Sequence, residues 1–195
     1  MKLHFRGKFD GDNSKLPTRE HEDNYVEFNE PDNLEKFSIA INIMAILLTG
    51  LGLLFFTIHT GSIKNFNTSG AILAILTLFP HELLHAICFK EDVYLFTNLS
   101  KGMLFVTGTE NISKKRAIFM NLLPNIVFGF VPFLIFLMNR EMYLLGSMAV
   151  FTIGMGAGDY YNVFNIIVQM PKNSYTYIIG TSSYWFKLNE SKEVY

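Results

Sequence analysis

The stretch "TLFPHELLHAICF", residues 77–89, places two histidines and a glutamate inside a segment that is otherwise apolar. His81, Glu82 and His85 form the pattern His-Glu-x-x-His. Ionisable groups are costly inside a membrane, so they are rare there and usually mark a pathway or a functional site. Whether this stretch lies in a membrane therefore decides both the fold and the chemistry.

The composition is that of a membrane protein. Of the 195 residues, 50% are hydrophobic, 15% aromatic and 17% charged, which is more apolar than a typical soluble domain. The apolar residues gather in segments that can each cross a hydrocarbon core of about 30 Å, which takes about 20 helical residues. We count four such segments, at about residues 37–59, 70–89, 117–138 and 142–170.

The sequence therefore predicts a mainly α fold, a four-helix transmembrane bundle with a small cytoplasmic β element. The membrane domain covers residues 37–170, between an N-terminal segment, residues 1–36, and a C-terminal segment, residues 171–195. The first apolar segment begins behind a polar stretch, which argues against a cleavable signal peptide. A soluble all-α bundle with unusually apolar helices is the alternative.

The loop at residues 90–116 has the pattern of a β-hairpin. The runs "DVYLFT" and "GMLFVTGT" are rich in β-branched and aromatic residues and flank the polar "NLSK", as expected for two strands and a turn. After Pro171, "SYTYIIGTSSYWFKL" alternates well enough for one or two more strands. Because an isolated hairpin is marginal in water, we expect it to pack on the membrane domain or to pair with another strand.

Lysine and arginine predict the orientation, because they are enriched in short cytoplasmic loops. Of the 16 such residues, only Lys64 and Arg140 fall in the two loops that would lie outside. Both termini and the loop at residues 90–116 are therefore predicted to be cytoplasmic. No basic run with interleaved aromatic residues suggests nucleic-acid binding, and a single cysteine, Cys88, excludes an intrachain disulfide.

The His-Glu-x-x-His pattern suits a zinc site. On a helix, His81 and His85 lie one turn apart on the same face and can reach one zinc ion. Glu82 can hold a water molecule and accept its proton. Inside a membrane each polar group needs an internal partner, and a metal satisfies all three. A buried hydrogen-bonded cluster, or the lining of a proton or ion path, is the alternative.

A catalytic zinc site needs a third protein ligand. The other histidines, His4, His21 and His59, precede the motif, in the polar N-terminal segment or at the outer end of the first span. Asp159 is the only acidic residue inside a later span, and a rise of 1.5 Å per residue puts it near the depth of the histidines. Its alternative is a polar contact unrelated to metal. Small residues that permit close helix approach, or an unwound turn, precede it, namely Gly154, Gly156 and Gly158.

The third span adds polar and helix-breaking residues near the same depth. Asn121 could donate a hydrogen bond to a developing oxyanion or to a substrate backbone, and Pro124 could kink the helix and free a carbonyl. An interfacial asparagine and an ordinary transmembrane proline are the alternatives. Cys88 shares a helical face with His81 and is either a spare ligand or an ordinary buried cysteine.

The motifs "PHELLHAICF", "KKRAIFMNLLP" and "GAGDYYNV" resemble a family of small bacterial membrane proteins described as zincin peptidases, over roughly residues 30–190. More distantly, the chain is similar to the site-two proteases, which are intramembrane zinc metalloproteases. The resemblance implies zinc ligands at His81, His85 and Asp159, and it implies a bacterial cell membrane as the location.

The same resemblance assigns the remaining site residues. It implies that Glu82 is catalytic and that Asn121 and Pro124 carry the asparagine-proline element of the site-two proteases. The chain departs from that pattern, because site-two proteases place this element and the ligand aspartate on one segment, whereas here Asn121 and Asp159 lie on different predicted spans.

Together these observations predict an integral membrane zinc metalloprotease that acts on a membrane or membrane-associated protein. In this hypothesis Glu82 activates water, and a strand of the hairpin at residues 92–108 holds the substrate extended. A membrane protein that binds metal or conducts ions or protons without hydrolysis is the competing hypothesis. A non-catalytic immunity or assembly factor is a third.

Overall fold

The computed structural model describes the chain apart from residues 32–33, 99–102 and 189–195. Its contacts divide the chain into two compact units. The sheet unit comprises Met1–Glu30, Glu82–Met120 and Val163–Tyr195, and the helical unit comprises Pro31–His81 and Asn121–Asn162.

Three helices begin in one unit and end in the other. They are α3 (Leu78–Ala86), α4 (Lys114–Asn125) and α7 (Ala157–Gln169). Each is therefore described below with the residues of the unit to which its two parts belong.

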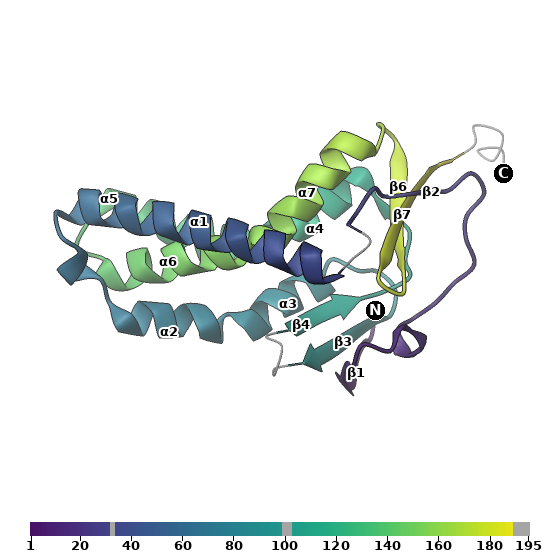
Figure 1. Cartoon of the computed structure of the whole chain (residues 1–195), viewed down its shortest axis with the longest axis horizontal. Helices are drawn as coiled ribbons and strands as arrows, with labels where there is room; N and C mark the ends of the chain where they lie inside the picture. Colours follow the sequence, from purple (N-terminus) through teal and green to yellow (C-terminus); the bar gives the residue numbers. More distant parts are fainter. Residues whose placement is uncertain (32–33, 99–102, 189–195) are drawn as a thin grey trace. The chain divides into compact units, whose positions relative to one another are not determined.

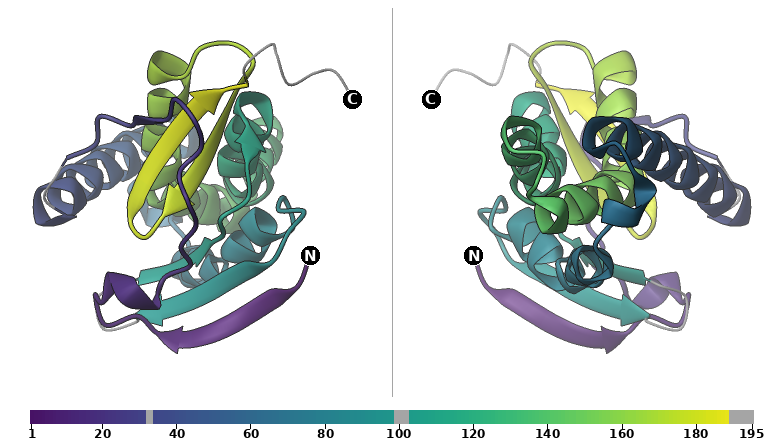
Figure 2. Two further views of the ribbon diagram at one scale, coloured as in Figure 1. Left: turned by 90° about the vertical axis from the view of Figure 1, so that its right-hand side faces the viewer. Right: turned by 90° about the vertical axis from the view of Figure 1, so that its left-hand side faces the viewer.

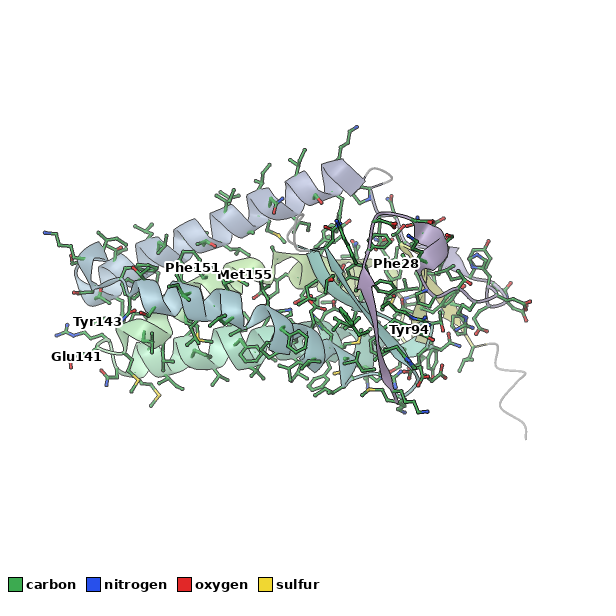
Figure 3. All side chains as sticks on the ribbon, turned by 90° about the horizontal axis from the view of Figure 1, so that it is seen from below. Phe28, Tyr94, Glu141, Tyr143, Phe151 and Met155 are labelled. Atoms are coloured by element: carbon green, nitrogen blue, oxygen red, sulfur yellow. The ribbon has the colours of Figure 1, made fainter. Side chains whose placement is uncertain are left out.

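The helical unit is built around one apolar helix, α6 (Tyr143–Met155), which packs against α1 (Leu34–Thr60), α2 (Thr68–Leu76) and α5 (Val131–Met138) (Figure 1). Its core contains Phe56, Phe136 and Val150. Figure 3 shows Glu141 and Tyr143 where α5 leads into α6, with Phe151 and Met155 farther along α6.

Short turns connect the helices of this unit. A 3-10 turn, η2 (Ile63–Asn65), follows α1, and Asn67 caps α2 by accepting hydrogen bonds from the N–H groups of Ser69 and Gly70. A π-helical turn, η4 (Ile126–Phe130), separates α4 from α5. Single π-helical turns of this kind occur mostly inside longer α-helices.

Three helical segments are long and apolar enough to span a membrane: Lys36–Thr60, Thr68–Ala86 and Lys114–Met138. They correspond to the first three predicted spans and indicate membrane association. The second segment contains α2 and α3, which are separated at Thr77. Pro80 explains the break, because a proline has no N–H to donate to the carbonyl four residues before it and its ring clashes with that carbonyl, here that of Leu76.

The structure does not confirm the fourth span or the four-helix count. Instead of one helix over residues 142–170, it has α6 and α7, of 13 residues each, separated at Gly156. Both are shorter than a membrane-spanning helix requires. The sequence also allowed an unwound turn at the glycines before Asp159, and the structure has such a break at Gly156.

The sheet unit contains two small sheets. In the first, β1 (Leu3–Lys8) pairs in parallel with β3 (Val93–Asn98), which pairs antiparallel with β4 (Met103–Thr107). These strands lie side by side in purple and teal in Figure 2. The second has the order β2-β7-β6-β5, with bounds Val26–Glu27, Ser182–Lys187, Ser174–Ile179 and Ile112–Ser113.

The predicted hairpin is confirmed as β3 and β4, and the predicted C-terminal strands are confirmed as β6 and β7. Most of the predicted "NLSK" turn lies outside the described residues. The expected partner strand for the hairpin is β1, in the N-terminal segment. The same segment also contains a 3-10 turn, η1 (Asn13–Lys15), which the sequence analysis did not predict.

The main core of the sheet unit joins helix and strand residues. Apolar side chains from β3, β5, α4, α7 and the segment after α3 pack together, including Phe89, Val93, Ile112, Ala117 and Ile166. A smaller cluster of Phe9, Leu16 and Phe96 lies at the first sheet. These cores anchor β4 and the last turn of α3, which carry the residues considered next.

Candidate metal centre

Helix α3 fixes the spacing of the two motif histidines. Its first turn is held to the preceding segment by a hydrogen bond from the His81 N–H to the Thr77 carbonyl, 2.8 Å. His81 and His85 are four residues apart on this one helix, so they lie on the same face, about 6 Å apart along the axis. Their relation depends only on the helix itself.

Within the helical unit, His81 meets Asp159 of α7. Nε2 of His81 lies 3.0 Å from Oδ2 of Asp159, and both side chains are largely buried. The same carboxylate oxygen accepts a hydrogen bond of 2.6 Å from Nδ2 of Asn125, the last residue of α4. This direct contact between His81 and Asp159 supports the predicted association of Asp159 with the motif.

Within the sheet unit, His85 is oriented by a backbone carbonyl. Its Nδ1 lies 2.9 Å from the carbonyl oxygen of Met120, and the side chain is buried. A carbonyl only accepts, so Nδ1 carries the proton and Nε2 carries the lone pair. Histidines that bind metals commonly donate their other ring N–H in this way.

The Met120 carbonyl is available to His85 because of Pro124. Pro124 lies inside α4, four residues after Met120, and a proline has no N–H to donate to the carbonyl of residue i−4. The sequence suggested that Pro124 could free a carbonyl, and the structure shows which one: that of Met120, which accepts from His85.

The side chains of His81, His85 and Asp159 together form a group that could hold a metal ion. The donor chemistry fits zinc, since two imidazoles and one carboxylate are a usual ligand set for catalytic zinc with one position left for water. Each side chain also offers a suitable atom: the lone pair on Nε2 of His85, and the facing Nε2 and Oδ2 atoms of His81 and Asp159.

Glu82, within the sheet unit, contacts the edge of the first sheet. One of its carboxylate oxygens accepts a hydrogen bond of 3.1 Å from the N–H of Val106 on β4. Strand β4 is an edge strand, because the sheet order is β1-β3-β4. The predicted base and the predicted substrate-binding strand are therefore in direct contact.

Asn121 is buried in the helical unit and links α4 to α7. Its Oδ1 accepts a hydrogen bond from Nδ2 of Asn162, 3.2 Å, and its backbone carbonyl accepts from Nδ2 of Asn125, 3.1 Å. These contacts place it beside the residues that surround Asp159. Its predicted catalytic role stays a prediction.

Sequence reasoning missed Asn125 and the reason for Gly156. Asn125 directly follows Pro124 in an apolar segment, and a buried amide next to a proline in a span was the available signal. A Cβ atom on Gly156 would clash with Oδ1 of Asn125. The glycine thus allows the close approach that accompanies the break between α6 and α7.

The remaining histidines make other contacts. His4 contacts Asp92 at 2.9 Å, and His21 contacts the hydroxyl of Tyr177 at 3.1 Å. His59 lies 3.4 Å from a backbone carbonyl in the helical unit. The thiol of Cys88, just beyond the end of α3, donates to the carbonyl of Leu84, as expected for an ordinary cysteine. It is outside the group of possible metal ligands found among the described residues.

A His-Glu-x-x-His motif on a helix is typical of the zincin class of metallopeptidase site, and here a carboxylate from another helix lies beside its first histidine. Residues 74–175 match the family described as "Putative zincin peptidase". This match covers more than half of the 195 residues, and the chain belongs to that family. No curated protein and no solved structure gives a significant match.

Proposed function

We propose that this chain is an integral membrane zinc metallopeptidase that hydrolyses peptide bonds of a membrane or membrane-associated protein. The observation that carries the proposal is the ligand set: His81 contacts Asp159, and these two residues and His85 each offer a ligand atom within 4.8 Å of the others. Family membership supports a metallopeptidase. The three apolar helical segments support a membrane setting.

Zinc, when bound, would polarise the peptide carbonyl. It would also lower the pKa of a water molecule, so that the water could give up a proton near neutral pH and attack. Glu82 would accept the proton of that water and deliver it to the leaving amine. The hydroxyl then ends on the carbonyl carbon, the C–N bond breaks, and the nitrogen leaves protonated. In this proposal Asn121 donates to the oxyanion or to the substrate backbone.

The outer edge of β4 is the proposed docking strand for the substrate. Val106 lies opposite Leu95 in the antiparallel pair, yet its N–H donates to Glu82, so it points away from β3. Alternate residues of a strand share this direction, which gives Leu104 the same outward orientation. An extended peptide can pair with these backbone groups.

Pairing at this edge would also change the environment of Glu82. A peptide carbonyl that accepts from the Val106 N–H competes with the Glu82 carboxylate for the same donor. A carboxylate that loses a hydrogen-bond donor becomes a better acceptor of a proton from water. The proposal thus couples occupancy of the strand edge to the proton transfer.

The surroundings complete the proposal. The bilayer is the partner of the three apolar segments, and the membrane is a bacterial cell membrane. Both termini face the cytoplasm in this proposal, which requires a return crossing by α6 and α7 in addition to the three apolar segments. Lysine and arginine placement supports this orientation, and nucleic acid has no part in it.

The test measures the metal content of detergent-purified protein by elemental mass spectrometry, alongside hydrolysis of membrane-protein substrates. We expect near-stoichiometric zinc in the wild type and its loss in His85→Ala and Asp159→Ala. Wild-type protein without zinc after supplementation would overturn the proposal. Zinc binding together with ion flux and no hydrolysis would favour the competing non-hydrolytic function.

A further inference from the structure

We propose that two consecutive residues, Pro124 and Asn125, are positioning residues that orient two of the three metal ligands. Asn125 orients Asp159 by a side-chain hydrogen bond, and Pro124 orients His85 through the Met120 carbonyl. The inference rests on the proposed metal site and deepens it. It assigns to the end of α4 a role that its residues perform without touching metal or substrate.

The amide of Asn125 can take only one orientation. Its Nδ2 donates to Oδ2 of Asp159, 2.6 Å, and to the carbonyl of Asn121, 3.1 Å. An amide NH₂ group has two hydrogens, and each of these bonds uses one. Rotating the amide by 180° would point its oxygen at a carboxylate and at a carbonyl, both of which only accept.

The position of Asn125 is as restricted as its orientation. The side chain is 1% exposed and follows Pro124, which lies within α4. On another side it lies against Gly156, where any Cβ atom would clash with its Oδ1. Residues from α4, α7 and the α6–α7 break thus hold one amide against one carboxylate, all within the helical unit.

A neutral donor suits this place. A buried carboxylate needs hydrogen bonds to offset its loss of hydration. A lysine or arginine in place of Asn125, however, would compete with a metal cation for the negative charge of Asp159. Asn125 supplies the hydrogen bond without a charge. It also fixes one oxygen of Asp159, which sets how the carboxylate is presented.

Pro124 acts on the second ligand through the backbone. Without an N–H at residue 124, the α4 ladder makes no bond to the Met120 carbonyl, which instead accepts from Nδ1 of His85. That bond fixes the ring and leaves Nε2 as the metal-binding nitrogen. Alanine at position 124 would restore a competing donor for the same carbonyl.

The experiment measures zinc affinity by competition with a chelator, in purified full-length protein. We expect Asn125→Leu, which keeps the size and removes the donor, to weaken binding about 10- to 100-fold, the range for partners of metal ligands. Gly156→Ala should weaken it in the same direction, because the added methyl displaces Asn125 without removing any polar group. Pro124→Ala should have a smaller effect, since a carbonyl can accept two hydrogen bonds.

Two controls separate positioning from a general loss of structure. Asn165, on α7, is buried like Asn125, but its amide nitrogen has no hydrogen-bond partner among the described residues. Asn165→Leu should therefore leave zinc affinity unchanged. Pro132 is the control for Pro124, because the carbonyl four residues before it, that of Phe128, accepts from Thr152 and not from a ligand. Pro132→Ala should also leave zinc affinity unchanged.

A spectroscopic readout reports ligand geometry directly. With Co²⁺ in place of zinc, Asn125→Leu and Pro124→Ala should shift the visible absorption bands, and the two controls should not. If the wild type binds zinc and both positioning variants bind it equally well with unchanged Co²⁺ spectra, the inference is wrong while the proposed function stands. If the wild type binds no zinc, both fail.

Discussion

The two units satisfy their polar side chains in different ways. The sheet unit uses ion pairs, including Arg116 with Glu110 and Arg19 with Glu22. The helical unit, among its described residues, uses amides, hydroxyls and one histidine–carboxylate contact, that of His81 with Asp159. Charged pairs suit a setting with water, whereas neutral donors are less costly to bury in apolar surroundings.

The apolar residues differ in the same sense. Helix α1 exposes a series of large apolar side chains, namely Ile39, Ile43, Ile46, Leu47, Leu51, Leu54 and Ile58. The sheet unit has a core of buried apolar side chains that includes Phe89, Val93 and Ile112. A helix that is apolar on its outer face fits lipid. The comparison indicates that the helical unit suits apolar surroundings and the sheet unit suits water.

The largest expected effect concerns Glu82, the carboxylate that α3 contributes to the sheet unit. Glu82→Gln should lower hydrolysis by at least about 100-fold, because it removes the proposed proton acceptor, while zinc content stays near the wild-type level. Initial cleavage rates and elemental analysis of the same preparation measure both quantities. Undiminished cleavage would show that Glu82 is not the base.

The next effect tests close packing in the helical unit. A Cβ atom at Gly70 would lie 2.5 Å from the Leu144 carbonyl oxygen, so Gly70→Ala must move backbone and should destabilise the unit by about 1–3 kcal/mol. Gly50, on α1, has no atom within 4 Å of such a Cβ. Gly50→Ala is therefore the matched control.

Unfolding in detergent, followed by circular dichroism, measures this pair. Gly50→Ala should be neutral or stabilising, because alanine is the better helix former by about 1 kcal/mol. Equal destabilisation by the two substitutions would contradict the distinction between the packed face at Gly70 and the open face at Gly50.

A smaller effect concerns Glu110, a buried acid of the sheet unit. Burial by itself would raise the pKa of Glu110, but hydrogen bonds from the N–H groups of Lys90 and Glu91 and from Arg116 outweigh it and lower the pKa below its ordinary value. A lowered folded-state pKa contributes stability above the unfolded-state pKa. That contribution is lost as the pH falls through the folded-state value.

Glu110→Gln should therefore lower the thermal unfolding midpoint near pH 7, and the difference from wild type should shrink as the pH falls below about 4.3, the ordinary glutamate value. Calorimetry across that range provides the measurement. A difference that grows at low pH would have the wrong sign for an ionised Glu110.

The smallest effect concerns the exposed ion pair of Lys15 with Asp10. Both side chains are about half exposed, and water and salt screen such pairs strongly. Lys15→Met should leave the thermal unfolding midpoint unchanged within error. A clear drop in the unfolding midpoint of Lys15→Met would show that this exposed ion pair stabilises the sheet unit as the buried pair of Glu110 and Arg116 does, contrary to the prediction.

Local sequence patterns were enough to predict most of the strands and membrane-spanning segments. Alternating β-branched and aromatic residues predicted β3, β4, β6 and β7, because strand periodicity is visible over a few residues. Runs of about 20 apolar residues predicted four membrane-spanning segments, and three of them are confirmed as long and apolar enough to span a membrane. The run at 142–170 was also apolar enough, but hydropathy does not register the approach of Asn125 to Gly156, which accompanies the break between α6 and α7.

The sequence by itself determined the spacing of His81 and His85, the glutamate between them and the apolar setting, because helix geometry and hydropathy are local properties. It also made Asp159 the best candidate for a third ligand. Tertiary structure alone decided that His81 contacts Asp159, that Asn125 holds the same carboxylate, that β1 pairs with β3 and that Glu82 meets Val106. Each of these joins residues distant in the chain, and a contact of that kind depends on how elements pack and not on any pattern within one segment.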